Sequence, residues 1–501
     1  MGAQELTYSS RFPIEAERLA AFGETPYFSL NPGHEVHLTG RKNGKPIELF
    51  LVPENEFSVL ELNEQDHRQI PCRHVEEITK EGGTTTSVVR YLLSRDTLTN
   101  DLYLFGEDEG VPQNDGSVDF RVLWRAGTAN ATAGLWMSGN YLVGARYVQG
   151  TWAAQHTRLA ENQEEALALN LPFGSLQDVV KIQTIRQAGL NRQAREWFFA
   201  PGIGLVAQDS DLKLETMRIG SRGIPKGAHF VPSSQHPYFP LVPGSTTRIE
   251  GIEDFLETIV ETEVLDEVKQ IELVQDGDPL LINARVVEER EFVNGDLFER
   301  GRNYYAQCLE TGDVYILGED VEIFLENGDV VVQGDTWLAG KDGAEAGIIM
   351  PGNLTIGATH LQENVPDISL NESKMLAASV TATVPLGTFN HCIQIVETSL
   401  FFADEEPGVK TYAPGIGLID DEGILKLTSV SEGSPLSPPN LEIEKAVRLT
   451  WPTGPLSYRL ESSSDSIDWR NADVEPRRTP DHFEAVFPSE GPHQFFRLVE
   501  E

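Results

Sequence analysis

The chain has 501 residues, and its 78 acidic and 39 basic side chains give a formal net charge of −39. A surface this negative repels phosphate backbones and anionic lipid, so nucleic acid and anionic membrane surfaces are excluded as expected partners. The length predicts two to four domains, and no stretch reaches the roughly 18 consecutive apolar residues that a membrane helix needs.

The N-terminal segment, MGAQELTYSS, has neither a basic nor an apolar region of the kind that begins a secretory leader. Helical signal is scarce, and the best candidates for a helix are Pro13–Phe22 (PIEAERLAAF) and Ala160–Leu169 (AENQEEALAL). These two segments do not occupy matching positions in the repeat described next. We therefore expect neither helix to belong to a common core.

The chain repeats itself at an offset of 211 to 213 positions. In chain order, PYFSLNPG at Pro26 matches PYFPLVPG at Pro237, and DLYLFGED at Asp101 matches DVYILGED at Asp313. Further along, the sequence APGIGL occurs both at Ala200 and at Ala413. The constant order predicts a duplicated domain over residues 10–218 and 233–431. A Gly/Pro/Ser-rich linker separates the two copies, and a second break precedes a small module over residues 440–501.

Both copies alternate apolar and polar residues, are rich in β-branched side chains, and carry turn pairs such as Asn-Gly at Asn294 and Asn327. Consecutive hairpins indicate an antiparallel meander. The predicted fold is therefore all-β, with two homologous antiparallel curved-sheet or half-barrel domains in tandem and a small C-terminal β-sandwich-like module. In APGIGL, proline fixes one φ angle and two glycines permit positive φ, so we interpret the stretch as a turn between strands.

Three stretches carry a resemblance: PYFPLVPG, YYAQCLETGDVYILGED and VPLGTFNHC…TYAPGIGL. They are similar to a family of uncharacterised bacterial secreted or lipoprotein β domains. The resemblance covers nearly all of the second copy and is weaker over the first, and the tail resembles modules appended to secreted bacterial proteins. It implies a curved antiparallel sheet and an extracellular or periplasmic location, and no chemistry.

Candidate site residues come from polar and aromatic positions shared by the copies. The paired carboxylates Glu107–Asp108 and Glu319–Asp320 are oxygen ligands of the kind that hold calcium, although acidic residues also solvate strand ends. Aromatic side chains on a curved sheet bind sugar rings or apolar ligands, although most fill cores. The candidate ligand-binding residues are Trp124, Trp337, Gln149 and Gln362. No Ser–His–Asp or Cys–His set is repeated, so no catalytic residue is assigned.

Three hypotheses of function remain open. The first is a non-catalytic secreted or envelope protein that binds an apolar or glycan ligand, or a protein partner, on its curved sheets. The second is an extracellular polysaccharide-active enzyme with paired carboxylates, and the third is a structural or adhesive surface protein. A hollow, aromatic-lined sheet favours the first, whereas filled sheets favour the third. For Cys308 and Cys392, two buried thiols are favoured over a disulfide.

Overall fold

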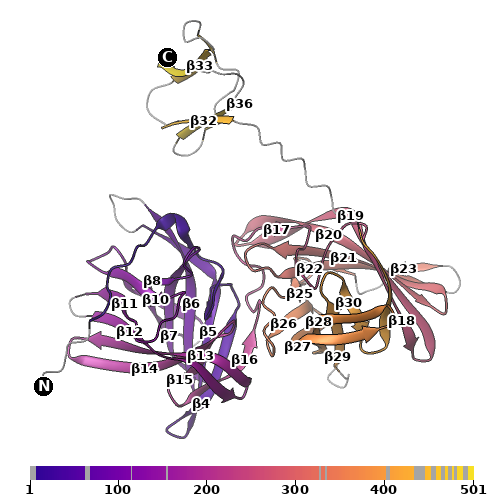
Figure 1. The fold of residues 1–501 in the computed structure, drawn as a ribbon, viewed down its shortest axis with the longest axis horizontal. Helices are drawn as coiled ribbons and strands as arrows, with labels where there is room; N and C mark the ends of the chain where they lie inside the picture. The colour runs from indigo at the N-terminus through magenta and orange to yellow at the C-terminus, as the bar shows by residue number, and fades with distance from the viewer. Residues whose placement is uncertain are drawn as a thin grey trace. The chain divides into compact units, whose positions relative to one another are not determined.

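The computed structural model describes residues 7–61, 68–113, 115–153, 156–325, 329–332, 336–401 and 407–433, together with the strands of the C-terminal part. The chain divides into two compact units, Met1–Ser434 and Pro435–Glu501. Strands make up almost all of the regular structure (Figure 1), so the all-β prediction is confirmed. Within the described residues, no helix is long and apolar enough to span a bilayer.

The first half of the large unit is an antiparallel sheet that closes on itself, which we call ring 1. Each strand pairs with its successor, and the last strand pairs with the first, so the pairing returns to its start. Strand β9 (Val118–Arg125) extends the sheet beside β8. The closed sequence of strands is β4 (Glu35–Lys42), β5 (Lys45–Glu61), β6 (Gln69–Glu81), β7 (Thr84–Asp96), β8 (Leu102–Pro112), β10 (Thr132–Met137), β11 (Arg146–Trp152), β12 (His156–Leu171), β13 (Gly174–Ala188), β14 (Asn191–Ala200), β15 (Gly204–Gln208) and β16 (Leu212–Arg218).

The second half forms a closed sheet of the same strand order, which we call ring 2. Its last strand again pairs with its first, and an isolated bridge joins Glu345, two residues before β25, to Asn364 of β26. Strands β23 (Val330–Val332) and β24 (Trp337–Leu338) pair beside β22. The strands are β18 (Thr246–Glu253), β19 (Leu256–Gln275), β20 (Asp278–Val293), β21 (Asp296–Cys308), β22 (Val314–Phe324), β25 (Gly347–Met350), β26 (Thr359–Val365), β27 (Ser369–Val384), β28 (Gly387–Ser399), β29 (Gly408–Ala413), β30 (Gly417–Asp421) and β31 (Leu425–Ser431).

Closure pairs most strand edges within each ring, which removes most of the unpaired backbone groups that an open curved sheet would present. Short elements lie outside the rings. They are the 3₁₀ turn η1 (Ala16–Arg18), β1 (Leu19–Ala20), β2 (Glu24–Thr25), β3 (Phe28–Ser29) and β17 (Phe230–Val231).

The pairing registers of the two rings coincide, which fixes equivalent positions residue by residue. Val75 lies opposite Tyr91 in ring 1, and Val287 lies opposite Asn303 in ring 2. The strand pairs that contain Trp197 and Lys410 likewise share one register. Each ring 1 residue in these strands therefore has an equivalent residue in ring 2.

Neither candidate segment forms an α-helix. Ala160–Leu169 lies inside strand β12, which pairs along its length with β11 and β13. In Pro13–Phe22 the only helical element is the three-residue turn η1. At Ala160 and Asn162 the side chains are buried on one face, so alternation against two partner strands outweighs the local helix propensity of the Glu/Ala-rich segment.

The APGIGL turns have the backbone conformation that we predicted. Gly202 and Gly415 have φ angles of 71° and 78°. The amide of each glycine donates to a proline carbonyl, that of Pro26 in ring 1 and that of Pro237 in ring 2. The ring 1 turn also contacts ring 2, because the Gly202 carbonyl accepts a hydrogen bond from Asn353 Nδ2 at 2.9 Å.

Cys72, Cys308 and Cys392 are buried free thiols, in agreement with the favoured prediction for Cys308 and Cys392. The C-terminal unit has two three-stranded sheets, β32–β36–β35 and β34–β33–β37. The strands are β32 (Ala446–Pro452), β33 (Tyr458–Ser463), β34 (Arg470–Asn471), β35 (Arg477–Arg478), β36 (His482–Pro488) and β37 (Phe495–Glu500).

Candidate ligand-binding cavity

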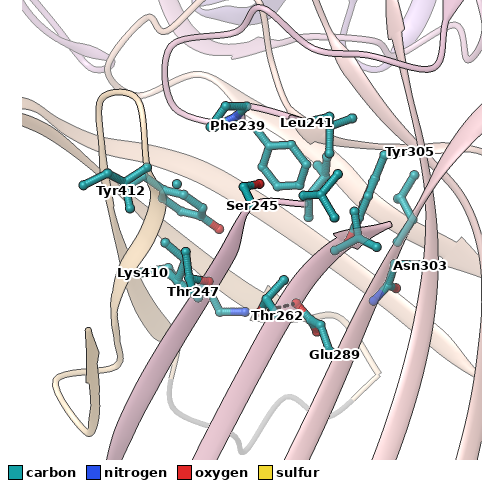
Figure 2. Close-up of a pocket in the computed structure, with 18 of the residues that line it drawn as sticks. Phe239, Leu241, Ser245, Thr247, Thr262, Glu289, Asn303, Tyr305, Lys410 and Tyr412 are labelled. Atoms are coloured by element: carbon teal, nitrogen blue, oxygen red, sulfur yellow. Dashed lines mark hydrogen bonds between the residues drawn. The ribbon is translucent and has the colours of Figure 1, made fainter. Parts of the chain in front are cut away.

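Ring 2 encloses a cavity of about 260 Å³. Its wall combines aromatic rings, aliphatic side chains and a small set of charged groups contributed by most strands of the ring. Figure 2 shows aromatic rings at the cavity together with the polar ends of Lys410, Thr262 and Glu289. The residues that line the cavity include Phe239, Thr262, Glu289, Asn303, Tyr305, Glu319, Ile349, Gln362, Glu363, Lys410 and Tyr412.

The corresponding place in ring 1 is filled. A void of only about 10 Å³ remains there, between Trp136, Arg158 and Trp197. The registers show why the interiors of the rings differ. Four positions that carry bulky side chains in ring 1 carry smaller or more slender side chains in ring 2. The replacements are Tyr91 by Asn303, Trp136 by Ile349, Trp197 by Lys410 and Arg158 by Asn371. The cavity therefore results from side-chain volume in a shared backbone frame.

Lys410 is held at one side of the cavity by an ion pair. Its Nζ lies 2.9 Å from Glu397 Oε2 on the neighbouring strand. Burial alone lowers the pKa of this amine, but Glu397 and Asp421 outweigh burial and raise the pKa above its usual value. Lys410 is therefore a fixed positive charge, held by acidic groups at its side of the cavity.

Glu289 is the carboxylate whose pKa the cavity changes most clearly. Burial raises the pKa above its ordinary value, while Lys410 acts in the opposite direction. Thr262 Oγ1 donates to Glu289 Oε1 at 3.4 Å, a long hydrogen bond. A buried carboxylate with a raised pKa gains from any further positive charge or donor placed beside it.

The equivalent carboxylates of ring 1 are neutralised by built-in arginines. Glu77, which corresponds to Glu289, accepts from Tyr91 Oη at 2.7 Å and lies 3.4 Å from Arg195 Nη1. Glu107, which corresponds to Glu319, lies 3.3 Å from Arg158 Nη1 and 3.7 Å from Arg186 Nη2. Ring 1 thus carries its own counter-charges in its interior.

In each of the two carboxylate pairs predicted to bind calcium, the two side chains lie on opposite faces of the sheet. Successive residues of a strand point to opposite faces. Glu107 therefore faces the ring 1 interior, whereas Asp108 pairs with Arg125 at 2.6 Å. In ring 2, Glu319 lines the cavity, whereas Asp320 pairs with Lys269 at 3.1 Å.

Within the part of the chain that the structure describes, no group of three or more His, Cys, Asp or Glu side chains is arranged to hold a metal ion. The cation partners of Glu107, Asp108 and Asp320 are arginine and lysine side chains. Calcium binding stays a prediction.

Of the four residues predicted to bind a ligand, one lies in the cavity. Gln362 lines the cavity and accepts a hydrogen bond from Ser373 Oγ at 2.6 Å. In ring 1, Gln149 instead donates to the backbone carbonyl of Trp136 at 2.7 Å. Trp124 stacks on Trp152 in the core, and Trp337 lies in the hydrophobic cluster that also contains Tyr305 and Tyr412. Both tryptophans are buried, so their role is packing.

The comparison of the two copies in the sequence did not assign Glu289 to a site. It missed Lys410, Asn303, Tyr305 and Tyr412, because it searched for positions where the copies agree. The cavity is instead indicated by positions at which the copies differ, where one copy has a large side chain and the other has a small or charged side chain.

Comparison with known proteins gave no match to a protein-family model, a curated protein or a solved structure.

Proposed function

We propose that the protein is a non-catalytic binding protein, and that ring 2 holds a small organic ligand in its interior while ring 1 serves as a filled structural module. The observation that supports this proposal is the difference between the two interiors, about 260 Å³ in ring 2 and about 10 Å³ in ring 1. An empty cavity loses packing contacts, so a ring that keeps one gives up stability that the filled ring retains.

The chemistry of the wall suits a ligand with both an apolar and a polar part. Phe239, Tyr305 and Tyr412 supply aromatic surface, and Asn303 and Gln362 supply amide groups. Small-molecule sites usually span roughly 300–1,000 Å³ and place a few polar groups among apolar side chains. The wall of the ring 2 cavity is polar and apolar in about equal parts, and its volume of about 260 Å³ lies just below this range, which favours a compact ligand.

The same volume argues against the polysaccharide-active enzyme. Glu289 and Glu319 are two carboxylates in one cavity, on strands separated only by β21. A glycosidase, however, needs a cleft that passes a sugar chain across its two carboxylates. A cavity of about 260 Å³ suits a compact molecule rather than a length of sugar chain.

The proposal is tested by filling the cavity with the residues that ring 1 uses. The variant Asn303→Tyr/Ile349→Trp restores two ring 1 side chains at equivalent positions. Ligand-observed NMR with a few hundred soluble fragments, of neutral, cationic and anionic character, should identify binders of the parent chain. These binders should lose affinity at least tenfold in the filled variant.

Leu281→Trp is the matched control, because Leu281 is 55% exposed on the neighbouring strand β20. This variant should bind the fragments as the parent chain does. Fragments that bind the filled variant equally well, or a screen without a binder that depends on the cavity, would refute the proposed function.

A further inference from the structure

We propose that a second pocket, where the end of ring 1 meets ring 2, binds a small neutral ring that carries both a hydrogen-bond donor and an acceptor, as azoles and cyclic amides do. The pocket measures about 110 Å³. This inference goes beyond the proposed function, because in the described part of the chain the residues that line this pocket are different from those that line the ring 2 cavity.

The chain that leaves ring 1 forms part of the pocket wall. Strand β16 ends at Arg218, which pairs in parallel with Thr359 at the start of β26. The amide of Ile219 donates to the Thr359 carbonyl at 2.8 Å, which holds the following residues against ring 2. The pocket lies between these residues and strands of ring 2, and its wall includes Gly220, Ser221, Gly223, Tyr315, Ile348 and His360.

Two buried polar atoms of this wall have no hydrogen-bond partner among the residues that the structure describes. They are Nε2 of His360 and Oη of Tyr315, and the two residues are 2% and 1% exposed. A buried polar atom without a partner lowers the stability of the folded chain, and such atoms usually bond to protein, ordered water or a ligand. The two atoms therefore indicate an occupant that supplies their partners.

Ring 1 provides partners for the equivalent groups from its own chain. The registers place Tyr147 at the position of His360, and the Tyr147 hydroxyl donates to Asn162 Oδ1 at 3.1 Å. In ring 2 the residue equivalent to Asn162 is Met375, which offers no amide oxygen. The side chain that serves the ring 1 group is thus missing beside His360.

The position of Tyr315 shows the same contrast. Its ring 1 equivalent is Tyr103, whose hydroxyl donates to Asp101 Oδ2 at 3.4 Å. In ring 2 the equivalent carboxylate, Asp313, accepts from the Gly352 amide at 2.7 Å, and the Tyr315 hydroxyl stays without a partner within the described residues.

The segment that covers these groups is bulky in ring 1 and small in ring 2. The amides of Ser9 and Ile219 donate to equivalent carbonyls of the two rings, so the residues after Ser9 correspond to those after Ile219. In the first segment Phe12 packs beside Tyr103, with ring centres 6.2 Å apart. The second segment has Gly220, Ser221 and Gly223. The pocket is therefore the counterpart of a place that ring 1 fills with an aromatic ring.

The hydrogen-bonding groups of the pocket favour a neutral ligand. Burial lowers the pKa of His360 to about 4 and raises the pKa of Tyr315 well above its ordinary value. Near pH 7 the pocket thus presents a neutral imidazole and a hydroxyl. Nε2 donates or accepts according to the tautomer, and a hydroxyl does both, so a ligand with one donor and one acceptor serves either tautomer.

The charged side chains of the wall are engaged with protein groups. Arg218 Nη2 lies 3.3 Å from Glu372 Oε2, and Glu345 Oε2 accepts a hydrogen bond from Asn364 Nδ2 at 2.6 Å. An ionic ligand would therefore lose its hydration for contact with neutral groups, which is costly.

The volume sets the size of the ligand. A cavity of roughly 150 Å³ holds a benzene molecule, so about 110 Å³ suits a five-membered ring. A single water molecule is much smaller than this space, and the buried Ile348 adds an apolar surface that water does not satisfy.

The test uses three five-membered rings of similar shape. Pyrazole is neutral with one donor and one acceptor, thiophene is neutral without a strong hydrogen-bonding group, and tetrazole is an anion at pH 7. NMR titration of the full chain, labelled with ¹³C at histidine Cε1, follows His360, whose signal is identified by its absence in His360→Phe. Pyrazole should shift this signal to saturation, and thiophene and tetrazole should bind at least tenfold more weakly.

Tyr315→Phe removes the unpartnered hydroxyl and keeps the aromatic ring. This variant should bind pyrazole at least fivefold more weakly than the parent chain. Tyr103→Phe is the matched control, because it makes the same change at the equivalent position of ring 1, and pyrazole affinity should stay within twofold. Without ligand, Tyr315→Phe should melt at or above the parent temperature, whereas Tyr103→Phe, which loses a hydrogen bond to Asp101, should melt below it.

The outcomes separate this inference from the proposed function. Absence of a saturable shift of the His360 signal would show that only water fills the pocket and would overturn the inference, as would equal binding of pyrazole and thiophene. Pyrazole binding that is kept in Tyr315→Phe but lost in Asn303→Tyr/Ile349→Trp would place the probe in the ring 2 cavity, which overturns the second site and supports the first. Pyrazole binding that is kept in Asn303→Tyr/Ile349→Trp and weakened in Tyr315→Phe supports the second site.

Discussion

Trp197 of ring 1 and Lys410 of ring 2 occupy the same register position, and each is held by one 2.9 Å contact to the neighbouring strand. Trp197 Nε1 donates to Thr184 Oγ1, whereas Lys410 Nζ pairs with Glu397, the residue equivalent to Thr184. The same backbone arrangement thus supports a neutral pair that fills the interior of ring 1, and a charged pair that leaves room for the cavity in ring 2.

Trp197→Ala should strongly destabilise the chain, because the side chain is 4% exposed and fills the ring 1 interior. Loss of a buried tryptophan costs about 3–5 kcal/mol through lost transfer energy and the cavity left behind. Urea unfolding followed by circular dichroism measures this change. A loss below 1 kcal/mol would show that the ring 1 interior collapses around the gap and does not depend on the indole.

Arg158→Ala should cost about 3–5 kcal/mol, because it leaves the fully buried Glu107 carboxylate without the guanidinium beside it. The variant also opens a cavity shaped like the missing arginine side chain. Millimolar ethylguanidinium should then raise the melting temperature of the variant more than that of the parent chain, since a ligand of the folded state alone stabilises it. Equal shifts of the melting temperature in both proteins would contradict the prediction that removal of the Arg158 side chain opens a space for ethylguanidinium.

Asp313→Asn should change how stability depends on pH. Burial raises the pKa of Asp313 from 3.8 to about 6. An acid with a raised native pKa stabilises the folded state below the unfolded pKa, and this contribution is lost as pH rises through the native value. The asparagine variant should match the parent chain near pH 4 and exceed it by up to about 3 kcal/mol above pH 6.

Urea titrations of both proteins at several pH values measure this difference. The asparagine keeps an oxygen for the Gly352 amide, which donates to Asp313 Oδ1 at 2.7 Å. A constant stability difference between pH 4 and pH 8 would contradict the prediction.

Gly202→Val and Gly415→Val should each destabilise the chain by about 1–3 kcal/mol, because both glycines have positive φ. The two variants should differ in which parts of the chain they destabilise. A side chain at Gly415 meets open space, whereas one at Gly202 would lie 3.4 Å from Thr355 of ring 2. Gly415→Val should therefore lower the stability of ring 2 alone, and Gly202→Val should also weaken the contact between the rings.

Hydrogen exchange resolved by peptide distinguishes the two effects. Peptides around Asn353 and Thr355 should exchange faster in Gly202→Val, whereas in Gly415→Val the peptides of ring 1 should keep the parent rate. Parent-like melting of Gly415→Val would remove the conformational explanation of the repeated turn.

The repeat allowed much of the fold to be predicted from the sequence. Alternation and Asn-Gly turns predict the strands, and the positive φ of Gly202 and Gly415 follows from the turn chemistry of APGIGL. Closure of each sheet was not predictable, because the pairing of β16 with β4 joins residues more than 150 positions apart and has no local signature. The false helix at Ala160–Leu169 has the same cause, since long-range pairing outweighed local propensity.

The site was less predictable than the fold. Gln362 and Glu319 were identified and do line the cavity, but Trp337 was chosen for its residue type and is a core side chain. Whether a buried position is filled depends on the sum of side-chain volumes around it. Asn303 and Lys410 reveal the cavity only when compared with Tyr91 and Trp197 across the ring, which requires the register.

The seam between β25 and β26 has a consequence for rates. Gln149 in ring 1 ties the corresponding strands together by donating to the Trp136 carbonyl, whereas Gln362 in ring 2 bonds to Ser373 on β27. The Glu345–Asn364 bridge lies on this seam, and Ile349 and Gln362 bring the cavity wall to it. The ring 2 wall should therefore open first along this seam, because local opening begins where the fewest backbone hydrogen bonds join neighbouring strands. Limited proteolysis of the full chain should then cleave between β25 and β26 at a higher rate than between β10 and β11 of ring 1.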